Sequence, residues 1–378
     1  HAQSGRVDPS RISINIAFMP PVPDPLQVLS AISESVDVAT VLNNYNPPHS
    51  GFQELRTKLR ELRASSETKP GRINASTIES VISNMERWRW LPRDLGKTHV
   101  VVNVPDFTLG VYKDGAPVWH TKIVVGKPGT LATPLLSETM KFITVNPTWN
   151  VPPSIIRNEY LPAHERDPDA LQRIGLRVSY NQDGSLRVYQ PPGERNALGR
   201  IRFNFPNQFL VYQHDTSDKK LFARDSRAFS HGCMRVQDPE KYAEVLLLLS
   251  QPEENFTIAR VRSLYGDQEH TINLKQPIPV HVTYQTAFVD ENGQLNFRHD
   301  IYGLDAATLK LMRGDERMVA DTPIARPQNT SSRPVMARAP SRENRDWQGQ
   351  YWGGRFGGGE RAYASSPYRR IDRPFGLW

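Results

Sequence analysis

The chain has 378 residues, which exceeds one average domain and predicts a folded core with at least one accessory region. Its 31 prolines and its hydrophobic share of 38% indicate long stretches without regular structure. The net charge of +7 lies mostly in residues 331–378, where nine arginines stand against four acidic residues, so the rest of the chain lacks the basic pattern of a nucleic-acid-binding protein. No apolar run reaches about 18 residues, which predicts no transmembrane segment.

The first 96 residues are predicted to form an arm followed by helices. Five prolines indicate an extended arm over residues 1–25. Apolar residues then recur at helical spacing, and we expect a helical scaffold over residues 26–96 with three amphipathic helices. Ser76, followed three residues later by Glu79, is typical of the start of the third helix. The apolar stripes of these helices lie at residues 26–42, 52–62 and 78–88.

From Thr98 the apolar residues alternate instead, which is typical of strands. We expect a hairpin-rich sheet, with a buried helix at 239–249. Residues 154–199 interrupt the sheet with Pro, Arg and Asn around a predicted hairpin at 177–189, and such an insertion is either functional or a surface excursion. The strands are expected near residues 99–104, 108–112, 118–126, 140–145, 209–213, 280–290 and 295–298. The fold class is therefore α+β.

The single cysteine, Cys233, is the strongest candidate for chemistry. A lone thiol cannot form an internal disulfide, and one Cys with two nearby His is too few ligands for a closed zinc site, so we expect no metal and no cofactor. A nucleophile and an inert buried thiol remain, and the polar, flexible and cationic neighbours favour the nucleophile. A thiol with a pKa of about 8.5 needs a base, and His214, at the end of a predicted strand, is the candidate.

The neighbours of Cys233 suggest how the loop would work. Gly232 permits backbone angles that let the N–H groups near His231, Gly232 and Cys233 converge on an oxyanion. Ser230 is expected to hydrogen-bond the loop, and His231 either tunes the thiolate or shapes the loop. Arg235 has three open roles: pairing with a substrate carboxylate, lowering the thiol pKa, or forming a structural salt bridge.

His214 with the run Ser-His-Gly-Cys-Met-Arg at residues 230–235 resembles the signature of the L,D-transpeptidases, the YkuD-type enzymes that remodel bacterial peptidoglycan. Other segments resemble the large-capped branch of that family, in the same order. They are Trp-Asn-Val-Pro-Pro-Ser-Ile at 149–155, Pro-Pro-Gly at 191–193, Asn-Ala-Leu-Gly-Arg-Ile at 196–201 and Phe-Asn-Phe-Pro-Asn at 203–207.

The resemblance implies a mainly-β catalytic sandwich over residues 97–310, with a capping subdomain inserted at about 154–199 that acts as a lid. In this branch a peptidoglycan-binding module usually lies between the scaffold helices, but residues 64–74 are too few to hold one. Tyr212, Trp149 and Asn150 are candidate walls of the substrate cleft, with core packing as the alternative for Trp149.

The resemblance also implies the reaction. Cys233 would attack the carbonyl at the L-centre of meso-diaminopimelate in a tetrapeptide stem and form a thioester as D-Ala leaves, with His214 moving the protons. The main chain of Asp215 would orient His214. An amine of a second stem would then complete a 3→3 cross-link, and a carbapenem should acylate the same thiol.

Two other classes of function remain open at this stage. The same chemistry with water or a protein amine as acceptor would give an L,D-carboxypeptidase or an enzyme that anchors an outer-membrane protein to peptidoglycan. A non-enzymatic wall-binding scaffold is the other class, supported by aromatic residues in a disordered basic tail at 322–378. The chain begins at His1 rather than Met, so we expect that a signal peptide was removed or that the sequence starts downstream of one. The family resemblance implies a periplasmic location.

Overall fold

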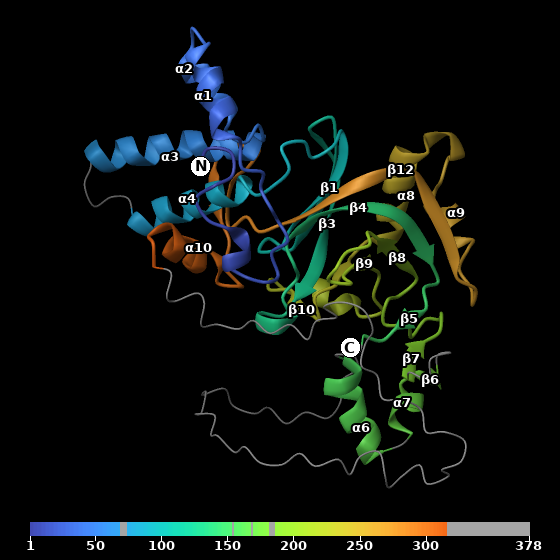
Figure 1. Ribbon diagram of the computed structural model, residues 1–378. Helices are drawn as coiled ribbons and strands as arrows, with labels where there is room; N and C mark the ends of the chain where they lie inside the picture. The colour runs from blue at the N-terminus through green and yellow to red at the C-terminus, as the bar shows by residue number, and fades with distance from the viewer. Residues whose placement is uncertain (69–73, 153–154, 168, 181–185, 316–378) are drawn as a thin grey trace, which may run out of the picture. The chain divides into compact units, whose positions relative to one another are not determined.

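The structure is a computed structural model, shown in Figure 1. It describes residues 1–68, 74–152, 155–167, 169–180 and 186–315. The chain divides into two compact units: the first holds residues 1–148 and resumes at residue 192, and the second holds residues 149–191. The tail at 322–378, for which disorder is predicted, lies outside the described residues.

A large mixed sheet forms the centre of the first unit. Its strands are β1 (Thr98–Asn103), β2 (Thr108–Lys113), β3 (Ala116–Gly126), β4 (Leu136–Val145), β8 (Ile201–Asn204), β9 (Gln213–His214), β10 (Ala228–Ser230), β11 (Met234–Val236) and β12 (His270–Thr283). Their order is β10-β3-β11-β9-β8-β4-β12-β1-β2. Because β3 also pairs with β2, the sheet closes on itself around an apolar core. With the helices around it, this sheet confirms the α+β class.

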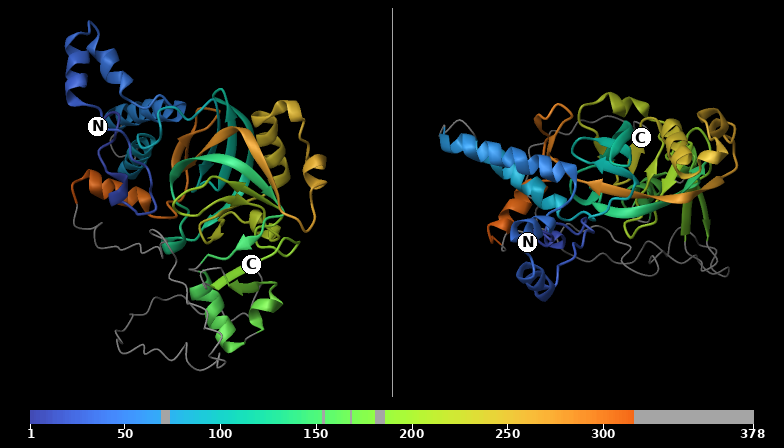
Figure 2. Two further views of the ribbon diagram at one scale, coloured as in Figure 1. Left: turned by 45° about the vertical axis from the view of Figure 1, so that its right-hand side comes forward. Right: turned by 90° about the horizontal axis from the view of Figure 1, so that it is seen from above.

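Two further elements cover this core. Helix α8 (Pro239–Ser250) packs against β12 and buries Tyr242 and Leu246 completely. Helix α9 (Ile258–Arg262) follows it, and both lie beside the sheet in the two views of Figure 2. The predicted helix at 239–249 is therefore present. No helix in the described ranges combines the length and apolar character needed to cross a bilayer.

The helical region before the sheet differs from its prediction in one place. The stripe at 26–42 forms two helices, α1 (Pro25–Ser33) and α2 (Val38–Asn44), because the Asp37 side chain caps a new helix start at Thr40 N, 3.1 Å away. Neither helix buries a residue, and Leu26 and Leu29 are 74% and 61% exposed. The stripe at 26–42 is therefore not a packed core face.

The next two helices do pack together. Helix α3 (Ser50–Thr68) and helix α4 (Ala75–Trp88) share a cluster that buries Phe52, Leu55 and Val81. Helix α4 begins one residue before Ser76, because the Asn74 side chain accepts a hydrogen bond from Ser76 N at 3.1 Å. Asn and Ser are both good N-caps, so the sequence signal alone places the start within a few residues.

The proline-rich residues 1–25 lie against the core. After a short turn at Pro9–Arg11, Ile12, Ile16 and Phe18 are buried in the main core cluster. The backbone of Ala17 donates to Leu135 O at 2.9 Å, next to a bridge between Ile16 and Leu135. The segment is mostly non-regular, as expected, but apolar contacts fix it from Val7 to Phe18.

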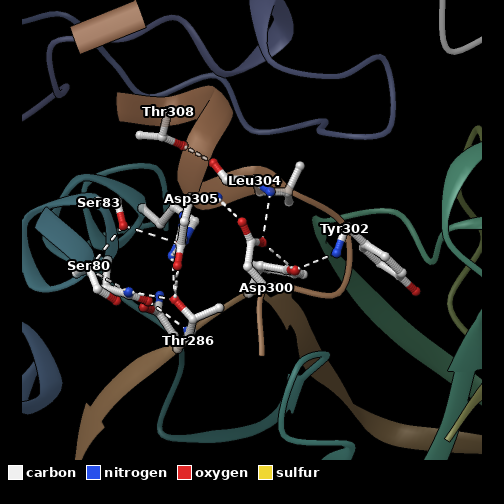
Figure 3. Close-up of polar contacts among 12 residues, drawn as sticks. Ser80, Ser83, Thr286, Asp300, Tyr302, Leu304, Asp305 and Thr308 are labelled. Atoms are coloured by element: carbon white, nitrogen blue, oxygen red, sulfur yellow. Dashed lines mark hydrogen bonds and ion pairs between the residues drawn. The ribbon is translucent and has the colours of Figure 1, made fainter. Parts of the chain in front are cut away.

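A polar cluster joins α4 to the segments that follow the sheet. The short hairpin β13 (Ala287–Val289) and β14 (Leu295–Phe297) follows β12, and α10 (Leu304–Met312) packs on α4. Asn84 of α4 and Thr286 exchange two 2.8 Å hydrogen bonds, and Arg87 pairs with Asp305 of α10. Figure 3 shows Thr286 and Asp305 facing each other beside Ser83. This cluster ties the scaffold helix to the segment that follows the sheet.

Three histidines lie together where the scaffold meets the sheet. His99 on β1 and His281 on β12 have ring centroids 5.8 Å apart, and His49 is electrostatically coupled to both. His281 is 3% exposed; its Nε2 donates to Leu95 O at 2.9 Å and its Nδ1 accepts from Ser137 Oγ at 2.8 Å, so the neutral ring has both partners. Burial lowers the pKa of His281 and of His49 to about 4 each, while nearby Asp94 opposes this for His281.

We expect acid to weaken the fold through His281. A histidine whose pKa is about 4 when folded and about 6.5 when unfolded stabilises the fold above pH 6.5, and this contribution is lost as the pH falls towards 4. Between pH 7 and 5 it amounts to about 2 kcal/mol. Urea unfolding of His281→Gln at both pH values should show a smaller loss than the wild type. His270→Gln, an exposed change on the same strand, should keep the full loss, and an equal loss in all three proteins would contradict the assignment.

The second unit has its own small sheet and core. Strands β5 (Trp149–Asn150), β6 (Arg177–Tyr180) and β7 (Leu186–Gln190) pair in the order β5-β7-β6, so the predicted hairpin is present. A π-helical turn at Ile156–Tyr160, α6 (Leu161–Arg166) and α7 (Ala170–Arg173) complete it. Its core includes Val151, Leu171 and Val188. That this unit acts as a lid stays a prediction.

Candidate active site

The pairing of β9 with β11 brings the histidine and cysteine segments together. These short strands run parallel, with Gln213 opposite Met234 and His214 opposite Arg235. The Met234 amide donates to Tyr212 O at 3.0 Å, so the pairing extends one residue toward Cys233. Because Cys233 directly precedes Met234, its backbone lies beside the segment that leads into His214.

His214 is oriented by a main-chain carbonyl. The imidazole is 5% exposed, and its Nδ1 lies 2.5 Å from the carbonyl oxygen of Asp215. Because a carbonyl can only accept, Nδ1 carries the ring proton and Nε2 keeps a lone pair in the neutral ring. The Asp215 carboxylate instead accepts from Arg200 N at 2.8 Å and Lys219 Nζ at 2.7 Å. The main chain of Asp215 thus contacts His214, as the family resemblance implies, while its carboxylate holds the Arg200 backbone and Lys219.

The surroundings of His214 keep the ring neutral. Burial lowers its pKa to about 3, and the positive charges of Arg235 and Arg202 add to this, while the carbonyls of Asp215 and Leu198 oppose it. At neutral pH the imidazole is therefore free of a second proton and can accept one. The neutral imidazole is the form that can accept a proton from a thiol.

The Ser230 hydroxyl bridges two backbone groups of the loop that carries Cys233. Ser230 Oγ donates to Cys233 O at 2.6 Å and accepts from Gly232 N at 3.2 Å. Gly232 has φ +113°, in the region that favours glycine, which matches the flexibility expected from the sequence. The Gly232 amide thus has a partner inside the loop, and that partner is Ser230, the residue expected from the sequence to hydrogen-bond the loop. The peptide N–H of Cys233 itself becomes the main candidate for binding an oxyanion.

Two arginines flank the histidine on the neighbouring strands. Arg202 on β8 is opposite His214, which is in turn opposite Arg235 on β11, so the three side chains share a row and a face. Burial lowers the pKa of Arg235, and the nearby Asp218 and Cys233 side chains oppose this effect. The Nε atoms of both arginines are buried without a hydrogen-bond partner among the described residues. The two arginines of this row thus place positive charge near the Cys233 thiol.

Arg202 was not identified from the sequence. Its alternation with Ile201 and Phe203 shows that it faces away from the core, but only the pairing of β8 with β9 places it at His214. Tyr212, which was identified, lies with its ring 5.8 Å from that of His214 in an edge arrangement, and Arg202 lies over the same Tyr212 ring at 5.5 Å.

The two remaining candidates belong to the second unit. Trp149 contacts Tyr160 edge-on at 6.4 Å between ring centroids and packs against that unit's own core. Asn150 Oδ1 accepts from Arg187 Nε at 2.9 Å. Within their unit both residues have structural contacts, and their role as cleft walls stays a prediction.

Comparisons with known proteins identify two regions of the chain. Residues 97–268 match the family model of the L,D-transpeptidase catalytic domain, and residues 1–59 match that of a scaffold domain. A Haemophilus influenzae protein assigned as an L,D-transpeptidase is 29% identical over 253 residues, which cover 62% of this chain and 50% of that protein. The chain therefore spans about half the length of the curated relative it matches.

Solved structures of L,D-transpeptidases are also similar to part of the chain. One from Mycobacterium smegmatis is 14% identical, with 50% of this chain and 58% of that chain covered and a TM-score of 0.26. The catalytic domain from E. faecium is 17% identical, with 49% and 95% covered and a TM-score of 0.22. Residues 97–268 thus match the YkuD type of L,D-transpeptidase catalytic domain, and residues 1–59 match a scaffold domain.

Proposed function

We propose that the protein is a peptidoglycan L,D-transpeptidase that forms 3→3 cross-links through a thioester on Cys233. The observation that carries this proposal is the neutral, buried His214, held at Nδ1 by Asp215 O on the strand beside Cys233. A neutral imidazole next to a thiol is the pairing that cysteine acyl transfer needs. The cell-wall substrate follows from the family.

The first half-reaction would consume the donor stem. His214 Nε2 takes the thiol proton as Sγ forms a bond to the carbonyl carbon of meso-diaminopimelate, and the oxyanion that develops accepts a hydrogen bond from Cys233 N–H. The C–N bond to D-Ala then breaks, and the imidazolium returns its proton to the leaving amine. The products are the thioester and free D-Ala.

The second half-reaction would reverse these steps with a new amine. The side-chain amine of a second stem loses a proton to His214 and bonds to the thioester carbon, and the C–S bond breaks to restore the thiol. Arg202 and Arg235 give this site the charge to hold a carboxylate of a stem peptide. In this proposal the protein acts in the periplasm.

Incubation with purified disaccharide-tetrapeptide, followed by mass spectrometry of the products, tests the proposal. We expect a cross-linked dimer with loss of one D-Ala, and no product from Cys233→Ala. A tripeptide without dimer would instead identify an L,D-carboxypeptidase, and coupling only to an added outer-membrane protein would identify an anchoring enzyme. If the wild type leaves the substrate unchanged but still sediments with peptidoglycan, as Cys233→Ala does, the protein is a binding scaffold.

A further inference from the structure

The carbonyl of Gly232, next to the nucleophile, is held from a distant segment. Thr133 Oγ1 donates to Gly232 O at 2.9 Å and accepts from Gly126 N at 2.8 Å. Thr133 is 1% exposed and lies just after the turn at Gly129–Leu131, between β3 and β4. One buried hydroxyl therefore joins the end of β3 to the loop that carries Cys233.

Tyr302, which follows β14 in the chain, adds to the hydrogen bonds of Thr133, and together these contacts form an anchor for the Cys233 loop. Its phenolic oxygen donates to Gly126 O at 2.6 Å and accepts from Thr133 N at 3.1 Å. The two hydroxyls of Thr133 and Tyr302 thus satisfy backbone groups of three segments, at Gly126, Thr133 and Gly232. The approach is so close that a Cβ on Gly126 would lie 1.9 Å from Leu131 O, which only glycine avoids.

Tyr302 is itself fixed by its neighbours. Its backbone N–H donates to Tyr284 OH at 2.8 Å, and the two rings stack with centroids 5.6 Å apart. Asp300 accepts from Tyr284 OH at 2.7 Å and from Leu304 N at 2.8 Å, which ties the group to the start of α10. Figure 3 shows the Tyr302 ring directed away from Asp300 and from the cluster around Asp305. A side chain held in this way is a rigid support.

The anchor determines where the Cys233 amide points. In a trans peptide the C=O and the following N–H point in opposite directions, so a Gly232 carbonyl held by Thr133 directs Cys233 N–H away from Thr133. Ser230 Oγ holds the Cys233 carbonyl at 2.6 Å on the other side. Both peptide planes that flank the nucleophile are thus set by hydroxyl groups.

We propose that Thr133 and Tyr302 are positioning residues for acyl transfer: they hold the Gly232–Cys233 peptide so that its N–H meets the developing oxyanion. The inference rests on the proposed acyl chemistry at Cys233. The hydrogen bonds described above join both hydroxyls to backbone groups. Their effect is confined to electrophiles that develop an oxyanion, because they act on an amide direction rather than on the thiol or on His214.

Two reagents separate these effects in the full chain. Meropenem acylates through a carbonyl and needs the oxyanion donor, whereas iodoacetamide alkylates a thiolate by displacement and does not. We expect Thr133→Val, which keeps the shape and loses the hydroxyl, to slow acylation by roughly 10²-fold, with alkylation within about threefold of wild type. Thr133→Ser, which restores the hydroxyl, should recover acylation. Rates come from intact-mass time courses.

Tyr302→Phe gives a second, independent test, and it remains available if Thr133→Val fails to fold by circular dichroism. It loses only the phenolic oxygen and should slow acylation by roughly tenfold, again without slowing alkylation. Wild-type acylation rates in both variants, an equal loss with both reagents, or no recovery in Thr133→Ser would overturn the inference. A wild type that meropenem leaves unmodified would instead remove the proposed function, which keeps the two failures apart.

Discussion

Replacing His214 with asparagine should slow acylation of Cys233 by meropenem about 10²–10⁴-fold. The Asn side-chain amide can still donate to Asp215 O, where His214 Nδ1 now lies at 2.5 Å, so the buried hydrogen bond is retained. What is lost is the lone pair at Nε2, the acceptor for the thiol proton. The measurement is the rate of adduct formation by intact mass, with the melting temperature as a check on the fold.

The pH dependence makes this prediction sharper. Because burial and the Arg235 charge lower the His214 pKa to about 3, protonation removes the base only near that pH. We therefore expect that the acylation rate of the wild type does not fall with a midpoint near pH 6.5, the pKa of an unperturbed histidine. His120→Asn, an exposed change on β3, should leave the rate unchanged. An acylation rate for His214→Asn within threefold of wild type would remove His214 from the base role.

Replacing Arg87 with leucine should lower the free energy of unfolding by about 3–5 kcal/mol. The Arg87 side chain is 2% exposed and pairs with Asp305, which is 17% exposed. It also donates to Thr286 Oγ1 at 3.1 Å and lies 5.4 Å from the centre of the Tyr284 ring. Without Arg87, the Asp305 carboxylate keeps only neutral partners in a mostly buried place, and this uncompensated charge causes the loss.

Two controls distinguish buried charge from lost packing in this measurement by urea unfolding. Lys58→Leu breaks a partly exposed ion pair with Glu61 on α3 and should cost less than about 1 kcal/mol. Adding Asp305→Asn to Arg87→Leu removes the unpaired charge while keeping the polar contacts, and it should recover part of the stability. If Arg87→Leu costs no more than Lys58→Leu, the ion pair has no role in joining α4 to α10.

Local patterns predicted the elements that depend on local physics. The alternation from Thr98 to Gly126 and the apolar run in α8 gave strands and a helix close to their observed bounds. The strand expected at 209–213 begins only at Gln213, because Asn207 Oδ1 accepts from Phe209 N and Val211 N and fixes a turn there, with Leu210 at φ +55°. The expected strand at 280–290 likewise breaks between β12 and β13.

Only the site residues that lie in the sequence motif could be predicted from the sequence. Cys233 and His214 were found because their local runs carry recognisable chemistry, but no spacing shows that β9 and β11 pair in parallel. Arg202, Thr133 and Tyr302 were missed for the same physical reason. Their importance comes from contacts across the fold, such as the Thr133 hydroxyl on the Gly232 carbonyl, and a lone Thr or Tyr in a sequence gives no sign of such a contact.

Strand β12 lies between β4 and β1, yet it begins at His270, just after the 97–268 segment that matches the catalytic-domain family. A polypeptide that ends at that boundary would leave β4 and β1 with unpaired edges, which can pair with other chains and cause aggregation. It would also lose Tyr302 and α10. The smallest autonomous folding unit is therefore larger than the segment that matches the family. Any truncated protein made for the laboratory should extend through Met312.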